Sequence, residues 1–522
     1  MDSVCGKLLT AVVILPLTAG NSRRRRNGSR YYDCIISSRV LFLVIFAIVI
    51  VFTASKSIRT HTEIRLEFVL LLLSLLMIST MVGFCVLAIL VHKHGLQYVV
   101  AGRRNTSTPK LQVIFLWVFG LASVFYCIFL VGKQIECSVD IANDGKKVGG
   151  YFWDTLLFFN ILMILCLFSQ MIAVTYFSPY ELKQTDLINF AMSMLLIVDV
   201  CIFVYITLIS DTFAYIVHIN NDAGISHCLK RNSTMIDLLH KSEQILRPNF
   251  TEFTLLSCTI LLEIWSPTKV PVSTDEMSYV ETQDAETIPL LPYVTQTQHT
   301  RGRRTACQLI SLMISLSLGI GHAIIYVAMA MGIGEIDKMR YITEVYELTL
   351  KVMIMFAIFA GFFCLVQYCT PDVSSKGLKT RDYVYLLSAF GLFMMHLAET
   401  IGGNVSSGRT ATILMYTSIF SIFQDYLQVV FLLHASRCKK ADPRTNIDLL
   451  ESILIFIFIS NFIFWFNDSF LISEFAVNRI LEHGSFSKDL QKTVYHVLLP
   501  VTVFFRFTSF LEYYATFVKY ST

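Results

Sequence analysis

The sequence predicts an all-α, polytopic membrane protein with about twelve transmembrane helices in two six-helix halves. Two observations predict this class. First, 55% of the 522 residues are hydrophobic and only 15% are charged, whereas about 25% of the residues in soluble domains are charged. Second, apolar segments recur along the whole chain, and about 20 apolar residues suffice to cross the hydrocarbon core as a helix. The composition excludes a soluble enzyme.

The predicted spans are distributed evenly on both sides of one long polar segment. The first six lie near residues 40–55, 66–91, 111–132, 151–177, 187–210 and 250–266, and the last six near 306–332, 345–368, 382–401, 410–434, 448–466 and 494–517. Two of them depart most from an apolar template. The sixth is short and polar, and the eighth opens with Glu344 and Glu347.

The distribution of basic residues predicts the orientation. An even number of spans places both termini on one side of the membrane, and Lys and Arg favour the cytoplasmic side. Basic clusters at Arg23–Arg26, Arg301–Arg304 and Arg437–Lys440 all fall on the side of the termini. We therefore predict a plasma-membrane protein with both termini cytoplasmic. The apolar run Lys7–Gly20 resembles a signal peptide, but the arginines behind it would hinder translocation and favour a cytoplasmic segment, residues 1–39.

The chain divides into two related halves. Residues 267–305 are rich in Thr, Glu, Asp and Pro and are predicted to form a disordered cytoplasmic linker between the halves 40–266 and 306–518. Polar residues recur in corresponding spans. Gln170 in the fourth span matches Gln428 in the tenth, and Asp199 in the fifth matches Asn461 in the eleventh. The pattern indicates a parallel duplication.

Ionisable residues inside the spans carry the functional prediction. A charge at the bilayer centre costs about 2.5–3.5 kcal/mol on insertion scales and commonly marks an ion or proton pathway. Glu252 and Arg506 each follow a proline by a few residues near the start of a span. They either set the electrostatics of a proton path or form an interhelical salt bridge that fixes packing, and both interpretations are retained.

Further polar residues have two interpretations each. Gln170, Gln428 and Asn461 either bridge helices, which we favour, or hold water in a proton wire. His396 and Glu399 are three residues apart and share a helix face. A histidine titrates in the physiological range and suits an acid sensor or relay, although a buried histidine satisfied by a neighbour is the commoner case.

Glu347 and Lys351 are expected to form a structural intrahelical pair. Cys137 and Cys228 fall in predicted outer loops, where they are candidates for a disulfide. The sequons at Asn232, Asn249 and Asn404 also fall outside and are predicted glycosylation sites. The sequence has no P-loop, nucleophile elbow or HExxH motif. We expect no enzymatic activity, metal, cofactor or nucleic-acid partner.

Several motifs resemble those of the otopetrins, a family of proton-selective channels. Residues 500–509, PVTVFFRFTS, resemble the family's P-x-x-x-F-F-R-F-H-S signature. Residues 461–470, NFIFWFNDSF, are similar to N-x-x-x-W-x-x-D-[ST]-F, and residues 424–431, QDYLQVVF, follow Q-x-x-L-Q-x-x-F. In the first half, Glu136-Cys137 and the run from Glu252 to Leu256 resemble two shorter family elements.

The resemblance implies a homodimer in which each half forms a six-helix barrel, with membrane lipid or sterol as a further partner. It also implies proton conduction down the gradient, a response to external acid and inhibition by zinc. The family's functional Glu, Gln, Asn and Arg positions correspond to Glu252, Gln170, Gln428, Asn461 and Arg506.

This chain departs from the family pattern at three positions. Thr508 stands where the family usually has His, Asp199 where it has Asn, and His434 where it has Asp. The sequence therefore predicts an acid-responsive, passive proton channel with Glu252, Asp199, His396 and Glu399 as candidate relay or sensor groups. The alternatives are a proton-coupled secondary solute transporter and a non-conducting receptor or scaffold.

Overall fold

The computed structural model describes most of the predicted spans. It covers residues 66–103, 109–143, 150–182, 186–208, 234–265, 306–330, 336–371, 380–405, 409–441, 447–470 and 488–521. The predicted N-terminal segment 1–39, the first span near 40–55 and the linker 267–305 lie outside the described residues.

Long helices occupy the described part of the chain. The first half contains α4 (Leu66–His94), α6 (Pro109–Asn143), α7 (Gly150–Phe177), α8 (Asp186–Leu208) and α11 (Thr234–Ile264). The second half contains α12 (Ala306–Ala330), α13 (Ile336–Tyr368), α14 (Thr380–Val405), α15 (Arg409–Arg437), α16 (Asp448–Phe470) and α18 (Lys488–Ser521). Every predicted span from the second to the twelfth therefore coincides with a helix. The chain is a multi-pass membrane protein.

By length and apolar composition, eight of the described helices are able to cross a membrane. The other three long ones are α8, whose apolar part Ala191–Thr207 is shorter, and α11 and α18. Pro248 and Pro500 were predicted near the starts of two spans, but they lie inside α11 and α18, which begin earlier. A membrane helix tolerates proline because neighbouring helices satisfy the freed backbone groups. The starts of α11 and α18, which we predicted from apolar composition alone, were therefore placed too late in the sequence.

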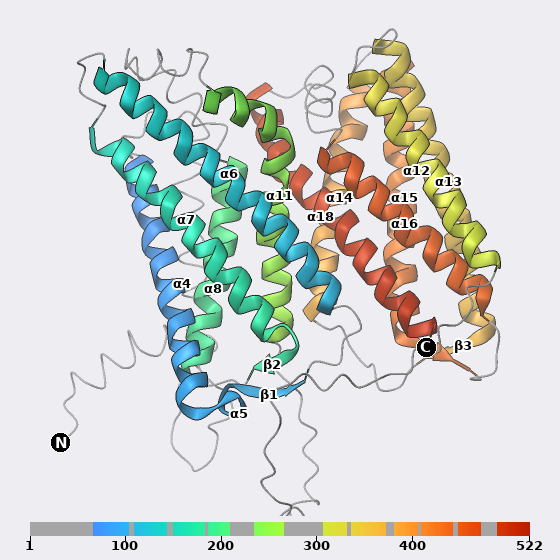
Figure 1. Ribbon diagram of the computed structural model, residues 1–522. Coiled ribbons are helices and arrows are strands. Elements are labelled where there is room, and N and C mark those ends of the chain that lie inside the picture. The colour runs from blue at the N-terminus through green and yellow to red at the C-terminus, as the bar shows by residue number, and fades with distance from the viewer. Residues whose placement is uncertain are drawn as a thin grey trace, which may run out of the picture.

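Two short antiparallel ribbons join the helix ends, which the all-α prediction did not include. After the short helix α5 (Leu96–Val99), β1 (Val100–Arg103) pairs with β2 (Tyr180–Leu182), and β3 (Cys369–Pro371) pairs with β4 (Cys438–Lys440). Figure 1 shows labelled strands of both ribbons at the same end of the molecule as the C-terminus. Strands of three or four residues are too short to produce a recognisable alternation of polar and apolar residues.

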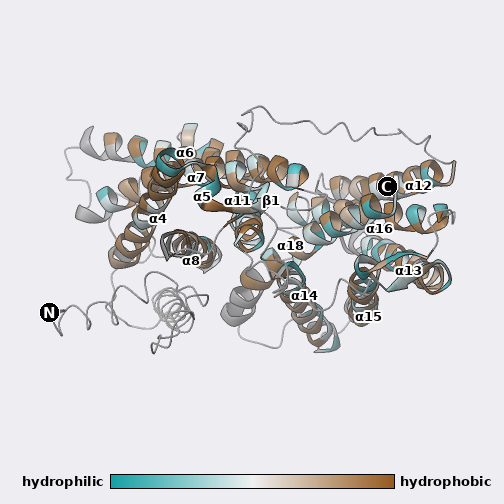
Figure 2. Ribbon diagram, turned by 90° about the horizontal axis from the view of Figure 1, so that it is seen from below, coloured by the Kyte–Doolittle hydropathy of each residue, from teal (hydrophilic) through white to brown (hydrophobic). Residues whose placement is uncertain are grey.

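The helices of the two halves pack in the same order. In the first half, α4 packs against α7 and α8, α6 against α7 and α11, and α8 against α11. In the second, α13 packs against α15 and α16, α14 against α15 and α18, and α16 against α18. Viewed along the helices, the two groups stand side by side (Figure 2). They meet where α11 of the first half contacts α14 and α18 of the second. A duplicated helical unit gives this arrangement.

Aromatic rings fill the contact between the halves. Phe115 and Phe119 of α6 meet Phe507 of α18 with ring centroids 5.0 and 5.2 Å apart. Phe119 also lies 5.7 Å from Trp465 of α16. Edge-to-face contacts of this kind add to the free energy gained by burying the rings. This inter-half aromatic cluster, completed by Phe510, makes its part of the contact apolar, whereas Arg381 of α14 lies 4.0 Å from Glu263 of α11 elsewhere in the contact.

Replacing Phe507 by Ala is expected to destabilise the protein by about 3–5 kcal/mol, since it opens a cavity in this cluster. The Phe507 side chain is fully buried, whereas Phe356 of α13 is 65% exposed on the outer surface. Phe356→Ala is therefore the matched control and should change the thermal midpoint of the detergent-solubilised protein much less. Equal midpoints for the two variants would contradict a packed contact between the halves.

Candidate functional site

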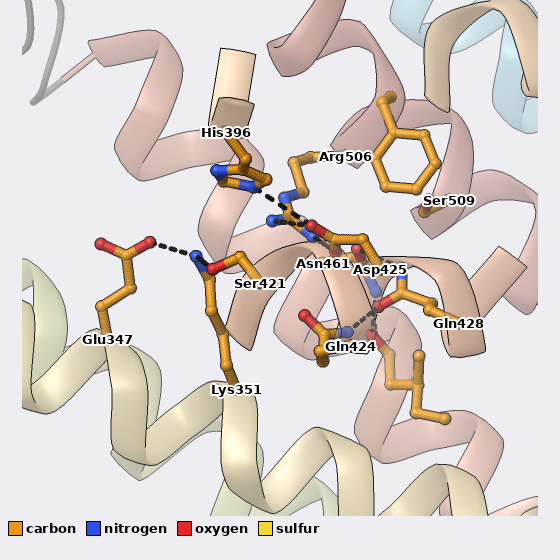
Figure 3. Close-up of polar contacts among 12 residues, drawn as sticks. Glu347, Lys351, His396, Ser421, Gln424, Asp425, Gln428, Asn461, Arg506 and Ser509 are labelled. Atoms are coloured by element: carbon orange, nitrogen blue, oxygen red, sulfur yellow. Dashed lines mark hydrogen bonds and ion pairs between the residues drawn. The ribbon is translucent and has the colours of Figure 1, made fainter. Parts of the chain in front are cut away.

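Oppositely charged side chains meet inside the second half. The Arg506 guanidinium on α18 donates from Nη1 to Asp425 Oδ1 of α15 at 2.8 Å and from Nη2 to Oδ2 at 3.4 Å (Figure 3). The Asp425 side chain is fully buried and that of Arg506 is 4% exposed. The guanidinium also lies over the Phe464 ring, 5.2 Å from its centroid. Each charge therefore has an oppositely charged partner, and of the guanidinium nitrogens Nε has no hydrogen-bond partner among the described residues.

A histidine on α14 extends this cluster. His396 Nε2 lies 3.2 Å from Asp425 Oδ2, and its Nδ1 lies 2.9 Å from Glu399 Oε2. The Ser418 hydroxyl donates to the same Glu399 oxygen at 2.9 Å. The structure thus brings together three predicted site residues, His396, Glu399 and Arg506, through Asp425.

A lysine on α13 lies in the same region of the second half. Lys351 Nζ lies 2.6 Å from Glu347 Oε1 and donates to Ser421 Oγ at 2.6 Å (Figure 3). The predicted intrahelical pair is confirmed, and it is buried, because Lys351 is only 1% exposed. Ser421 precedes Asp425 by four residues on α15, so the two ion pairs contact the same face of that helix.

Amide side chains bridge helices at corresponding places in the two halves. Gln428 Nε2 of α15 donates to Asn461 Oδ1 of α16 at 2.9 Å. Gln170 Nε2 of α7 donates to Asp199 of α8 at 2.7 and 2.8 Å and to Ser257 of α11 at 2.5 Å. Neither α15 with α16 nor α7 with α8 is among the closely packed helix pairs. Both bonds therefore cross the interior of their half, as the helix-bridging interpretation predicts.

A double-mutant cycle with Gln428→Leu and Asn461→Leu tests this bridge. Hydrogen bonds between membrane helices couple two side chains by about 0.6 kcal/mol on average. We expect the two substitutions to be non-additive by about that amount in the free energy of unfolding. Strict additivity would show that the amides act independently.

Glu252 has a different environment from the charges of the second half. Its side chain on α11 is 1% exposed, and neither carboxyl oxygen has a hydrogen-bond partner among the described residues. Of the two interpretations of Glu252 and Arg506, the salt bridge is not formed, because Arg506 pairs with Asp425 and both Glu252 oxygens lack a partner among the described residues. An isolated carboxylate in an apolar interior is very costly. Glu252 is therefore best satisfied as the neutral acid, which carries a proton.

Asp199 is the second buried carboxyl group of the first half. It is 1% exposed, and Gln170 donates to both of its oxygens. Among the described residues, no Lys, Arg or His lies within ion-pair distance of it. Among the described residues, the first half thus holds two buried carboxyl groups without a cation, whereas Asp425 and Glu347 of the second half face Arg506, His396 and Lys351.

Residue types alone did not identify Asp425 as a site residue. It occupies an unconstrained position of the QDYLQVVF motif, between Gln424 and Gln428. The available signal was charge balance, since a buried arginine requires an acidic partner in another span. His434, the third departure from the family pattern, is exposed on α15, and the Thr508 hydroxyl donates to the carbonyls of Phe504 and Phe505 in its own helix.

The predicted extracellular modifications have mixed outcomes. Asn249 is 5% exposed within α11 and donates to the Ile245 carbonyl, so a glycan does not fit there and that prediction is corrected. Asn404 is exposed near the end of α14 and stays a predicted site. Asn232 and Cys228 lie outside the described residues, as does the side chain of Cys137, so the disulfide also stays a prediction.

Comparison with known proteins gives one match. A family model described as Otopetrin matches residues 206–507, which is more than half of the chain. The match runs from the end of α8 into α18 and includes Glu252, His396, Asp425 and Arg506. No curated protein matches the chain.

Proposed function

Because the chain belongs to the otopetrin family, whose members are generally proton channels, we propose that it conducts protons passively across the plasma membrane in response to external acid. The observation that carries this proposal is Glu252. It is a fully buried carboxyl group in a membrane helix whose oxygens have no hydrogen-bond partner among the described residues. Such a group binds and releases protons but forms no fixed ion pair.

In addition to Glu252, the first half contains other groups that could exchange protons. Ser257 lies five residues after Glu252 on α11 and accepts a hydrogen bond from Gln170, which also donates to Asp199. A hydroxyl both donates and accepts hydrogen bonds, and a carboxyl group gains or loses a proton. Glu252, Ser257 and Asp199 are therefore the groups that we propose to exchange protons with water in the first half, with Gln170 orienting Asp199.

The second half has a different proposed role. Two of its buried acids lie next to cations: Asp425 contacts Arg506 and His396, and Glu347 contacts Lys351. Carboxylates held this way stay ionised and are poor proton carriers. We propose that this half chiefly fixes the packing and the electrostatic field of the subunit. At the contact between the halves, the aromatic cluster offers no titratable group, and Glu263 is paired with Arg381.

The remaining proposals follow from the family and the topology. We propose a homodimer in contact with membrane lipid or sterol, without enzymatic activity. Cytoplasmic termini are supported by the basic clusters, and Figure 1 shows the C-terminus at the end of the molecule where the ribbons lie.

Voltage clamp of cells expressing the chain tests the function. With surface expression verified by biotinylation, external acid should evoke an inward current. Its reversal potential should shift by about 59 mV per unit of pH gradient, the value for a single transferred charge. A current that requires a cosolute would instead support a proton-coupled transporter. Absence of current despite surface expression would contradict a channel.

A further inference from the structure

His396 contacts an acidic oxygen with each of its ring nitrogens. Nδ1 lies 2.9 Å from Glu399 Oε2, and Nε2 lies 3.2 Å from Asp425 Oδ2. A neutral imidazole has only one N–H donor, and an ionised carboxylate only accepts. Both contacts are therefore hydrogen bonds when the ring carries two protons. The geometry selects the imidazolium form.

The charges around the ring lead to the same assignment. The charged groups that face it are Glu399 of its own helix, Asp425 of α15, and Glu347 and Lys351 of α13, with Arg506 of α18 behind Asp425. Arg506 balances Asp425 and Lys351 balances Glu347. Glu399 is left without a cation unless His396 is charged. One proton on the ring makes these six residues neutral. Asp468 of α16 is a further acid near Arg506, Lys351 and Glu399, and it adds no charge when it carries its own proton.

Loss of that proton would not leave either acid without a donor. Asp425 keeps the Arg506 guanidinium, and Glu399 keeps the Ser418 hydroxyl. Deprotonation therefore breaks one of the two hydrogen bonds of the ring, to Asp425 of α15 or to Glu399 of α14, while each carboxylate keeps another hydrogen-bond donor. A link of this kind is reversible, because the rest of the cluster stays satisfied in both states.

Other described histidines of the second half lack this geometry. His322 contacts the Asn467 amide, and His434 is exposed. At position 508, two residues from Arg506, a threonine bonds to its own helix. His396 is thus the histidine that reaches the Arg506–Asp425 pair.

We propose that His396 is the positioning residue whose proton ties α14 to the Asp425–Arg506 pair and thereby sets the pH dependence of the current. This rests on the proposed function, because it assigns the pH dependence of that same conduction. Acid holds the cluster in its fully bonded form, and alkali releases the link. A neutral residue at position 396 should behave in acid as the wild type does in alkali.

The test compares currents of the full-length wild type, His396→Gln and the control His434→Gln between external pH of about 5 and 8, the range in which histidine titrates. After correction for driving force, the wild type and His434→Gln should show a pH-dependent step that His396→Gln lacks. Glu399→Gln removes one acceptor of the imidazolium, so it should retain the step but move it to lower pH. An unchanged profile in His396→Gln would overturn the proposal.

A second measurement separates this proposal from the proposed function. The thermal midpoint of the detergent-solubilised wild type should be higher in acid than in alkali, because the imidazolium bonds are present in acid. His396→Gln should remove that difference and His434→Gln should keep it. A wild type that conducts no protons but shows this difference would contradict the channel and support the His396 link. A current with no such difference in any variant would contradict the link alone.

Discussion

Replacing Glu252 by Gln is expected to reduce the proton current to background while leaving the fold intact. Gln has the same shape but does not exchange a proton at the pH of the experiment. Because Glu252 has no hydrogen-bond partner among the described residues, the substitution breaks no described contact. The free energy of unfolding should change by less than about 1 kcal/mol. Whole-cell current and thermal midpoint are measured on the same variant.

The matched control is Glu243→Gln, nine residues earlier on α11. Glu243 has a 37% exposed side chain and lies 3.9 Å from Arg247, so its loss should affect neither readout strongly. A normal current in Glu252→Gln would remove Glu252 from the pathway. A large fall in its thermal midpoint would show that this carboxyl group is structural.

Replacing Arg506 by Gln is expected to have the largest effect on stability. The substitution leaves Asp425 buried, with His396 as its remaining ion-pair partner in the described part of the chain. Breaking one side of a buried pair typically costs about 3–5 kcal/mol. We therefore expect a much lower thermal midpoint and little protein at the cell surface, measured by surface biotinylation.

The double variant Arg506→Gln/Asp425→Asn distinguishes charge pairing from other roles of Arg506. Removing both charges leaves neither uncompensated, so part of the lost stability should return. A double variant no more stable than Arg506→Gln would contradict the ion pair as the reason for the loss. Normal surface expression of Arg506→Gln with no current would assign Arg506 a functional role.

The helices were predictable from the sequence because lipid imposes a simple rule. Every backbone polar group must be satisfied within the membrane, so a long apolar run has to form a helix. The rule fails at helix ends. The spans predicted to begin near residues 250 and 494 start at Thr234 and Lys488, since α11 and α18 continue through polar turns and a proline.

The amide bridges were predictable because they repeat. Gln170 and Gln428 occupy matching spans, and each bonds to the matching partner, Asp199 or Asn461. Ion pairs do not repeat in this way. Glu252 and Arg506 were considered as a pair because they were expected at similar depth in the membrane, but they belong to different halves. Arg506 instead pairs with Asp425 on α15, 81 positions away in the sequence.

The choice of partner for a buried charge depends on which helices surround the same interior. Periodicity within one span does not contain that information. The contacts of His396 illustrate the point. Its neighbour Glu399 was visible from the three-residue spacing, whereas Asp425 reaches it from a helix that packs beside α14.

Proton flux into liposomes containing only the purified protein tests the central claim most directly. With a potassium gradient and valinomycin setting the voltage, a trapped pH-sensitive dye reports proton entry with no other solute present. We predict that the wild type acidifies the lumen down the proton gradient and that Glu252→Gln liposomes stay at the level of empty ones. Flux that requires an added solute, or equal flux in wild type and Glu252→Gln, would contradict a passive proton channel that uses this carboxyl group.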